Sequence, residues 1–144
     1  MFCKTLLDDR KRVFTVASGA TLAQAADLMT HHKIGALMVL SESGGLNGIF
    51  TERDLTRAVA GHAQEAPAFP VERFMTRDVV TCGPNDDLQY VMRLMDQRRI
   101  RHVPVVQDGL PVGMVSIRDV VDRLLEETAT ERDTLRDYVS GSVC

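Results

Sequence analysis

Short apolar runs alternate along the chain with segments whose apolar positions recur at helical spacing. The runs 13–16, 36–40 and 48–50 are too short for helices and rich in branched residues, so they predict buried strands. Between the first two runs, the apolar residues of 22–29 recur every three or four positions and predict a helix. A second helix is predicted over 53–60. The predicted order of elements is β-α-β-β-α.

The same order returns in the second half of the chain. Residues 79–82, 103–106 and 113–115 repeat the strand-like runs, and 88–95 repeat the helical spacing. A last helix is predicted over 118–127. The two runs closest together in each half are joined by a glycine-containing turn, which favours a β-hairpin.

Other signals mark where the elements begin and end. Ser18 in the first half and Asn85 or Asp86 in the second are the predicted helix N-caps. Residues 61–70 carry two prolines and several small residues, so they predict a linker. The stretch 120–139 has an apolar stripe with a polar middle, which fits one long helix or two. It either packs on its own unit or offers a face to a second subunit.

Sliding the sequence past itself by 66 positions shows that the two halves are copies. Val13, Thr15, Leu22, Leu28, Met29, Ile34 and Val39 then coincide with Val79, Thr81, Leu88, Leu94, Met95, Ile100 and Val105. After a one-residue deletion in the hairpin turn, Gly48, Arg53 and Asp54 coincide with Gly113, Arg118 and Asp119. A length change is tolerated best in a loop. The repeat predicts an α+β protein with a first domain over 1–66 and a second over 67–144.

Charge and hydropathy exclude some partners. The formal net charge is −3 and the pI near 5.8, so the chain has no bulk attraction for nucleic acid or anionic membranes. No apolar run approaches the roughly 20 residues of a membrane span. The first residues lack the pattern of a secretory signal. We therefore expect a cytoplasmic protein without nucleic-acid or membrane partners.

The cysteines and histidines suggest little chemistry. The three cysteines are far apart and odd in number, unlike a disulfide framework. Cys82 ends an apolar run and is interpreted as a small buried hydrophobic residue. Cys3 and Cys144, near the two ends, are candidates for contact with each other or with a second chain, and a redox role stays a lesser alternative. His31 and His32 lack the further ligands of a metal site, so no metal is expected.

Two related tetrapeptides carry the most information, Thr51-Glu52-Arg53-Asp54 and Ser116-Ile117-Arg118-Asp119. Each follows the second hairpin strand and opens a helix. A hydroxyl residue followed three positions later by an acid is close to a capping box. The same geometry suits a ribose phosphate, because a helix N-terminus and a hydroxyl attract phosphate while a carboxylate accepts hydrogen bonds from sugar hydroxyls. The two roles are compatible, and the sequence leaves both open.

Features of an enzyme are missing from the pattern. No Cys–His or Ser–His–Asp set can be assembled from ordered neighbours, and the two acidic motifs are expected in separate clefts. Neither a P-loop nor a dinucleotide-type glycine fingerprint occurs. We expect a binding protein without catalytic activity or catalytic cofactor.

The two copies resemble cystathionine β-synthase (CBS) domains, and the tandem resembles a Bateman module. The resemblance runs from about residue 6 to residue 127. It rests on an ordered set of strings that is repeated in the chain. The strings are IGALMV (34–39) and GIFTERD (48–54) in the first copy, and FMT (74–76), IRHVPV (100–105) and GMVSIRD (113–119) in the second.

The resemblance implies two copies packed sheet against sheet about a pseudo-twofold axis, with two symmetry-related clefts. In this family the Ser or Thr of the motif contacts phosphate and the Asp holds ribose. The base lies near the first strand and the first hairpin strand, and basic residues before that strand face the phosphates. The ligand-site residues implied are Thr15, Gly35, Ala36, Met38, Thr51, Arg53 and Asp54, with Thr81, Arg101, His102, Val103, Pro104, Ser116, Arg118 and Asp119.

The copies differ in the basic positions. The first copy has Gly35 and Ala36 where the second has Arg101 and His102. We therefore expect unequal occupancy of the two sites, with a change of Asp119 to alanine weakening binding more than the same change of Asp54.

The predicted function is a regulatory sensor of an adenosine-containing small molecule. AMP, ADP, ATP or NAD(H) is preferred to S-adenosylmethionine. Binding is expected to alter the packing of the copies, or of two chains in a homodimer, and thereby to signal to a separate, unknown regulated protein. The alternative is a dimerisation scaffold whose clefts bind nothing.

Overall fold

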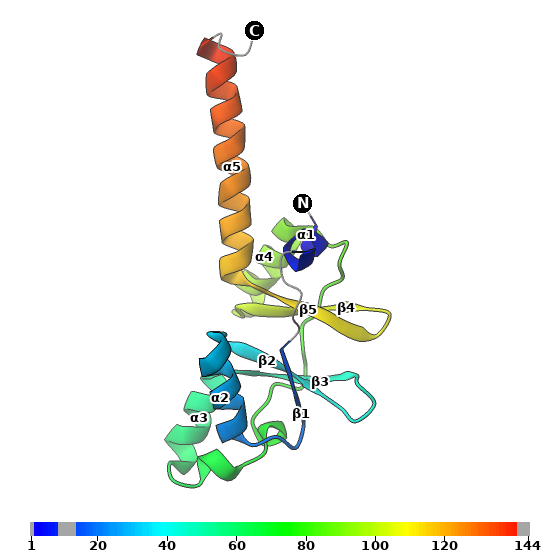
Figure 1. Cartoon of the computed structure of the whole chain (residues 1–144), viewed down its shortest axis with the longest axis vertical. Coiled ribbons are helices and arrows are strands. Elements are labelled where there is room, and N and C mark those ends of the chain that lie inside the picture. The colour runs from blue at the N-terminus through cyan, green and yellow to red at the C-terminus, as the bar shows by residue number, and fades with distance from the viewer. Residues whose placement is uncertain (1, 9–13, 141–144) are drawn as a thin grey trace.

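The structure, a computed structural model, describes residues 2–8 and 14–140. Two similar units lie one above the other, with a long helix rising from the second (Figure 1). The first unit consists of β1 (Thr15–Ala17), α2 (Leu22–His32), β2 (Ala36–Leu40), β3 (Leu46–Thr51) and α3 (Glu52–His62). The predicted β-α-β-β-α order is confirmed for this copy.

The first sheet has the order β1-β2-β3. β1 runs parallel to β2, and β2 pairs with β3 as an antiparallel hairpin. A single register shift falls after Val39, where the hairpin approaches its turn. The first four residues of β2, which form an apolar run, are all buried. This central strand therefore lies in the interior of the unit.

The second unit repeats this plan with α4 (Leu88–Arg98), β4 (His102–Gln107), β5 (Leu110–Ser116) and α5 (Ile117–Ser140). Its hairpin has a register shift after Val105, which is the residue that corresponds to Val39 in the repeat. The predicted alternatives for the C-terminal stretch resolve into one continuous helix. No helix within the described residues has the length and apolar character to cross a membrane.

The predicted strand over 79–82 is wrong, because only Cys82 pairs, in a parallel bridge with Val105. The preceding residues belong to the first unit instead. Thr76 exchanges both backbone hydrogen bonds with Ile49 at the free edge of β3, at 2.8 and 3.0 Å. The chain leaves that edge and reaches the second sheet only at Cys82, which leaves no length for a further strand pair.

The predicted helix N-caps are also displaced. Thr21 caps α2 in a capping box with Gln24, and Asp87 caps α4. Ser18 instead donates its hydroxyl to the carbonyl of Leu40 at 3.2 Å. Asp86 accepts the amide N–H of Gly83 at 2.7 Å, so its carboxylate stabilises the turn before the helix. Ser18 and Asp86 thus form hydrogen bonds just before the helices that they were expected to cap.

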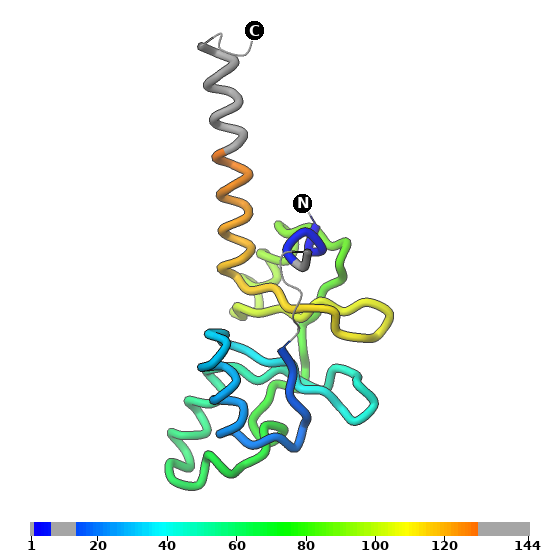
Figure 2. Tube along the Cα trace, in the orientation of Figure 1, coloured from blue at the N-terminus to red at the C-terminus, as the bar shows by residue number. Residues whose placement is uncertain are grey.

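Each unit is closed by the segment that precedes the other copy. The predicted linker over 61–70 is not a free connection, because residues 61 and 62 end α3 and the short 3-10 helix η1 (Ala66–Ala68) follows. A second 3-10 helix, η2 (Val71–Arg73), comes directly after the linker, and Ala66 and Val71 are buried in the first core. The second core is closed by α1 (Cys3–Asp8), a helix that the sequence pattern did not predict. Figure 2 shows α1 beside the second unit, although β1, the next element, belongs to the first.

Candidate functional site

A cavity of about 480 Å³ lies where the two units meet. One side comes from the end of β3 and the start of α3, and the other from the end of α4 and the start of β4. The residues that connect the units form part of its wall. The full lining is Gly35, Ile49, Thr51, Glu52, Arg53, Asp54, Arg57, Thr76, Asp78, Val79, Val80, Arg98, Arg99, Ile100, Arg101 and His102.

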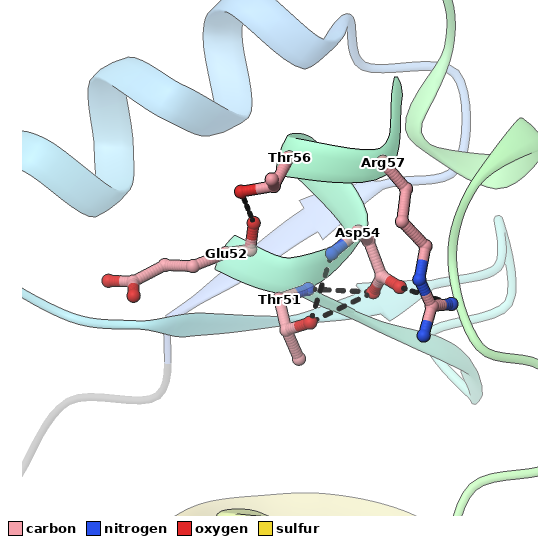
Figure 3. A network of polar contacts seen from close by, with 5 residues as sticks. All are labelled: Thr51, Glu52, Asp54, Thr56 and Arg57. Carbon is pink, nitrogen blue, oxygen red and sulfur yellow. Dashed lines mark hydrogen bonds and ion pairs between the residues drawn. The ribbon is translucent and has the colours of Figure 1, made fainter. Parts of the chain in front are cut away.

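The first motif forms a complete capping box at the start of α3 (Figure 3). The Thr51 hydroxyl accepts the amide N–H of Asp54 at 3.4 Å. Asp54 Oδ2 accepts the amide N–H of Thr51 at 2.9 Å and the Thr51 hydroxyl at 3.2 Å. Asp54 is only 3% exposed, and its Oδ1 lies 3.9 Å from the guanidinium of Arg57. Capping and cavity lining therefore coexist in the same two residues.

The hairpin fixes the position of this helix start. The amide N–H of Glu52 donates to the carbonyl of Gly35 at 3.1 Å, which ties the first turn of α3 to the residue before β2. In the second unit the amide of Ile117 makes the matching bond to the carbonyl of Arg101 at 2.8 Å. The repeat thus places each motif beside the start of its own hairpin.

The opposite side of the cavity carries positive charge. Helix α4 ends at Arg98. Its C-cap, Arg99, has the left-handed backbone conformation (φ 55°), and the chain then turns back into β4. The turn brings together Arg98, Arg99, Arg101 and His102, which we call the basic wall. Across from it, the first motif presents its acid, and the exposed Arg57 adds a further cation to the lining.

The His102 ring lies beside Gly35 of the first unit. A Cβ built on Gly35 would come within 3.3 Å of the His102 ring and of the Glu52 carboxylate, so the first copy has no room for a side chain there without displacing one of them. Burial lowers the pKa of His102 below its ordinary value, and Arg101 lowers it further. Glu52 and Asp119 act in the opposite direction. An anion entering the cavity would likewise favour the protonated ring.

The second motif is also a capping box, at the start of α5. Ser116 accepts the amide N–H of Asp119 at 3.2 Å, and Asp119 Oδ2 accepts that of Ser116 at 3.3 Å. Neither residue lines the cavity described above. The basic wall of the second copy therefore faces the motif of the first copy. In this cavity the wall is combined with Asp54, whereas Asp119, whose carboxylate raises the pKa of His102, acts on the wall from outside the lining. The expectation that Asp119→Ala weakens binding more than Asp54→Ala stays a prediction from the sequence, and the lining of this cavity favours the opposite order.

The cavity gathers six of the residues expected from the sequence. These are Gly35, Thr51, Arg53, Asp54, Arg101 and His102. The others lie outside its lining: Thr15, Ala36, Met38, Thr81, Val103, Pro104, Ser116, Arg118 and Asp119. Among these, Ala36, Met38 and Val103 are fully buried strand residues, and their side chains belong to the packed interior.

Some lining residues were not named as site residues. Glu52 and Arg57 lie beside Asp54 on α3. Arg57 follows Asp54 by three positions, about one helical turn, and this spacing was enough to predict that the two side chains are neighbours. Val79 and Val80 fall in the predicted strand over 79–82, and Asp78 immediately precedes it, so none of the three was expected in a ligand site. Within residues 2–8 and 14–140, no group of three or more metal-binding side chains occurs.

Comparison with known proteins accounts for this architecture. The family model for the CBS domain matches the chain twice, over residues 7–61 and 71–126. The chain belongs to the CBS-domain family. It is a CBS-domain pair, which confirms the predicted fold class.

Individual relatives agree with this assignment. The mitochondrial CBS domain-containing protein CBSX3 of Arabidopsis thaliana is 37% identical over 125 residues, which cover 84% of this chain and 61% of that protein. This CBS pair thus spans less than two thirds of that relative. The crystal structure of the CBS-domain protein ATU1752 from Agrobacterium tumefaciens superposes with a TM-score of 0.80 at 42% identity, covering 84% of this chain and 91% of the other.

One similar structure contains ligands. The CBS-domain pair of protein MJ0100, in complex with 5′-methylthioadenosine and S-adenosyl-L-methionine, has a TM-score of 0.77 and 31% identity to this chain. The superposition covers 89% of this chain and 98% of that one. Adenosine-containing molecules therefore bind to a closely similar CBS pair.

Proposed function

We propose that this CBS pair is a regulatory module that binds an adenosine-containing ligand in the cavity between its units. The observation that carries the proposal is that the cavity combines the hydroxyl and acid of one copy with the basic wall of the other. The MJ0100 pair, bound to two adenosine derivatives, supports the same class of ligand.

In the proposed complex the ribose lies on Asp54. The Oδ2 atom of Asp54 accepts hydrogen bonds from Thr51, whereas Oδ1 faces the guanidinium of Arg57. The Arg57 side chain is 67% exposed, and an ion pair so exposed contributes little to stability. Ribose hydroxyls donating to Oδ1 would gain charge-assisted hydrogen bonds. The Thr51 hydroxyl and the N-terminus of α3 then meet a phosphate attached to the sugar.

The basic wall narrows the proposed ligand class. 5′-Methylthioadenosine and S-adenosylmethionine carry no phosphate, whereas Arg98, Arg99 and Arg101 offer several donors suited to phosphate oxygens. We therefore keep AMP, ADP, ATP or NAD(H) as the preferred ligands of this chain. The proposed action is non-catalytic: ligand binding changes the packing of the units, and a separate protein responds in the cytoplasm.

A second function, dimerisation without a ligand, is favoured by α5. The apolar side chains of Val121 and Leu125, in the first half of this helix, are 37% and 62% exposed. They stand four positions apart on the same face of the helix, and an exposed apolar stripe on a helix is typical of an interface. A homodimer can combine ligand binding with dimerisation. The regulatory function requires that a nucleotide change the stability or packing of the protein, and the scaffold function does not.

The test is thermal unfolding of the whole chain with AMP, ADP, ATP, NAD, S-adenosylmethionine and 5′-methylthioadenosine. A ligand at 100 times its Kd adds about 2.7 kcal/mol to the free energy of unfolding. We expect a phosphorylated adenosine to give the largest rise in Tm. Arg101→Ala should reduce the rise, and Arg93→Ala, which removes an exposed arginine of α4 outside the cavity, should not. If no adenosine compound stabilises the protein, the scaffold function is the correct one.

A further inference from the structure

Two buried thiols meet outside the lining of the cavity proposed to hold the nucleotide. Cys3, in α1, and Cys82, at the edge of the second sheet, have their sulfur atoms 3.8 Å apart although 79 positions separate them in sequence. Cys3 is completely buried and Cys82 is 6% exposed. From the sequence, Cys3 was a candidate for contact with Cys144 or with a second chain. The structure places Cys3 against Cys82 instead, and Cys144 lies outside the described residues.

Backbone hydrogen bonds hold both cysteines in place. The amide N–H of Cys82 donates to the carbonyl of Pro104 at 3.0 Å, and its carbonyl accepts from Val106 at 2.8 Å. The amide of Cys3 donates to the carbonyl of Asp86 at 2.9 Å. A disulfide has a sulfur–sulfur distance of about 2.05 Å, so the sulfur atoms need to approach by about 1.8 Å. With both backbones anchored, side-chain torsions have to supply that movement.

We propose that Cys3 and Cys82 are a redox modification site, at which a peroxide converts the two thiols to a disulfide that fastens α1 to the second unit. Helix α1 packs on the second unit, whereas β1, the next described element, belongs to the first. Val79 and Val80, just before Cys82, line the nucleotide cavity, so the bond forms close to its wall.

The environment distinguishes the two sulfur atoms. The hydrogen bond from the Cys82 thiol lowers the pKa of Cys3, against the opposing effects of burial and of Asp86. The same contact and burial raise the pKa of Cys82. Cys3 is therefore the first nucleophile, because the thiolate is the reactive form.

The chemistry proceeds in two balanced steps. The Cys3 thiolate attacks one oxygen of hydrogen peroxide, the O–O bond breaks, and Cys3 sulfenic acid and hydroxide form. The Cys82 sulfur then attacks the Cys3 sulfur, the S–O bond breaks, and the oxygen leaves as water with the Cys82 proton. The hydroxide is neutralised by the proton that Cys3 released. In sum, two thiols and one peroxide give a disulfide and two water molecules.

Access to the buried pair requires local opening. Helix α1 has six residues, too few to be stable without its packing, so its displacement costs less free energy than unfolding of the whole second unit. A partial displacement of α1 that keeps the two sulfur atoms in contact admits peroxide to the pair. The disulfide then prevents that displacement.

The experiment treats the whole reduced chain with hydrogen peroxide, blocks the remaining thiols by alkylation and maps the tryptic peptides without reduction. Trypsin places Cys3, Cys82 and Cys144 in three different peptides. We expect the peptide with Cys3 to be joined to that with Cys82 within one chain, and the mass of the protein to fall by two hydrogen atoms. A Cys3–Cys144 bond, bonds between chains only, or alkylated Cys3 and Cys82 after treatment would each overturn the proposal.

A second measurement tests the structural effect. In the variant Cys144→Ser, which keeps the pair, oxidation should raise the Tm on the order of 10 °C, because the bond closes a loop of 79 positions. The matched control Cys3→Ala with Cys144→Ser keeps only Cys82 and should show no rise. The reduced forms of both variants are compared first, so that any loss of packing from Cys3→Ala is known. An equal rise in the two variants would contradict the site.

Discussion

Two matched substitutions, Asp54→Asn and Asp119→Asn, separate the roles of the two motifs. Both acids complete capping boxes at the starts of equivalent helices, yet only Asp54 lines the cavity with the basic wall. An asparagine side chain can still accept the amide N–H of Thr51 or Ser116 through its oxygen. Each variant should therefore fold, with a similar loss of about 1 kcal/mol from replacing a charged acceptor and a favourable charge at a helix N-terminus.

The two variants should differ in binding. In the proposed complex Asp54 Oδ1 accepts hydrogen bonds from ribose hydroxyls. Hydrogen bonds to a charged group contribute about 1.5–3 kcal/mol, and an amide NH₂ at this position cannot accept them. Asp54→Asn should therefore weaken binding of AMP by about 10- to 150-fold, whereas Asp119→Asn should leave affinity for this cavity within about threefold.

Isothermal titration of AMP into the wild-type chain and both variants measures the difference. Chemical denaturation of the same samples shows whether the losses of stability are equal. Equal losses of affinity in the two variants would refute the assignment of Asp54 to the occupied cavity. A larger loss in Asp119→Asn would restore the pairing that sequence alone suggested.

Two further predictions concern packing and pH. A Cβ on Gly48 would lie 2.9 Å from the Thr76 carbonyl oxygen and 2.6 Å from the Met75 sulfur, so Gly48→Ala should cost about 1–3 kcal/mol in denaturation. Gly61→Ala in α3 meets no atom and should be neutral or stabilising, and a comparable loss in both would contradict the close approach. Because the pKa of His102 is lowered in the folded state, the unfolded chain binds the additional proton first, and the free energy of unfolding should fall as the pH drops below about 6.5. His102→Asn should reduce that slope between pH 7.5 and 5.5, and an unchanged slope would show that other groups cause it.

Much of the fold follows from local pattern. The apolar runs that became β2 and β4, and the glycine turns after them, predict both hairpins because each signal is confined to a few neighbouring residues. The repeat predicts that both motifs stand at helix starts, and the capping boxes of Thr51 and Ser116 confirm it.

The parts that pattern missed depend on contacts between distant segments. Helix α1 is too short to be stable alone, and its buried Cys3 packs on a core formed by residues beyond position 80. Ser18 and Asp86 have the chemistry of N-caps, but nearby backbone groups engage them first. The spacing of the basic wall along the chain carries no information on which motif it faces. That depends on how the two units pack.

The most direct test of the central claim is a crystal structure of the wild-type chain grown with saturating AMP. We predict density for the nucleotide in the cavity between the units, with ribose on Asp54 and phosphate between the start of α3 and Arg98 or Arg101. Density for AMP bound only elsewhere, or an empty cavity at a concentration that saturates the protein in solution, would contradict the account.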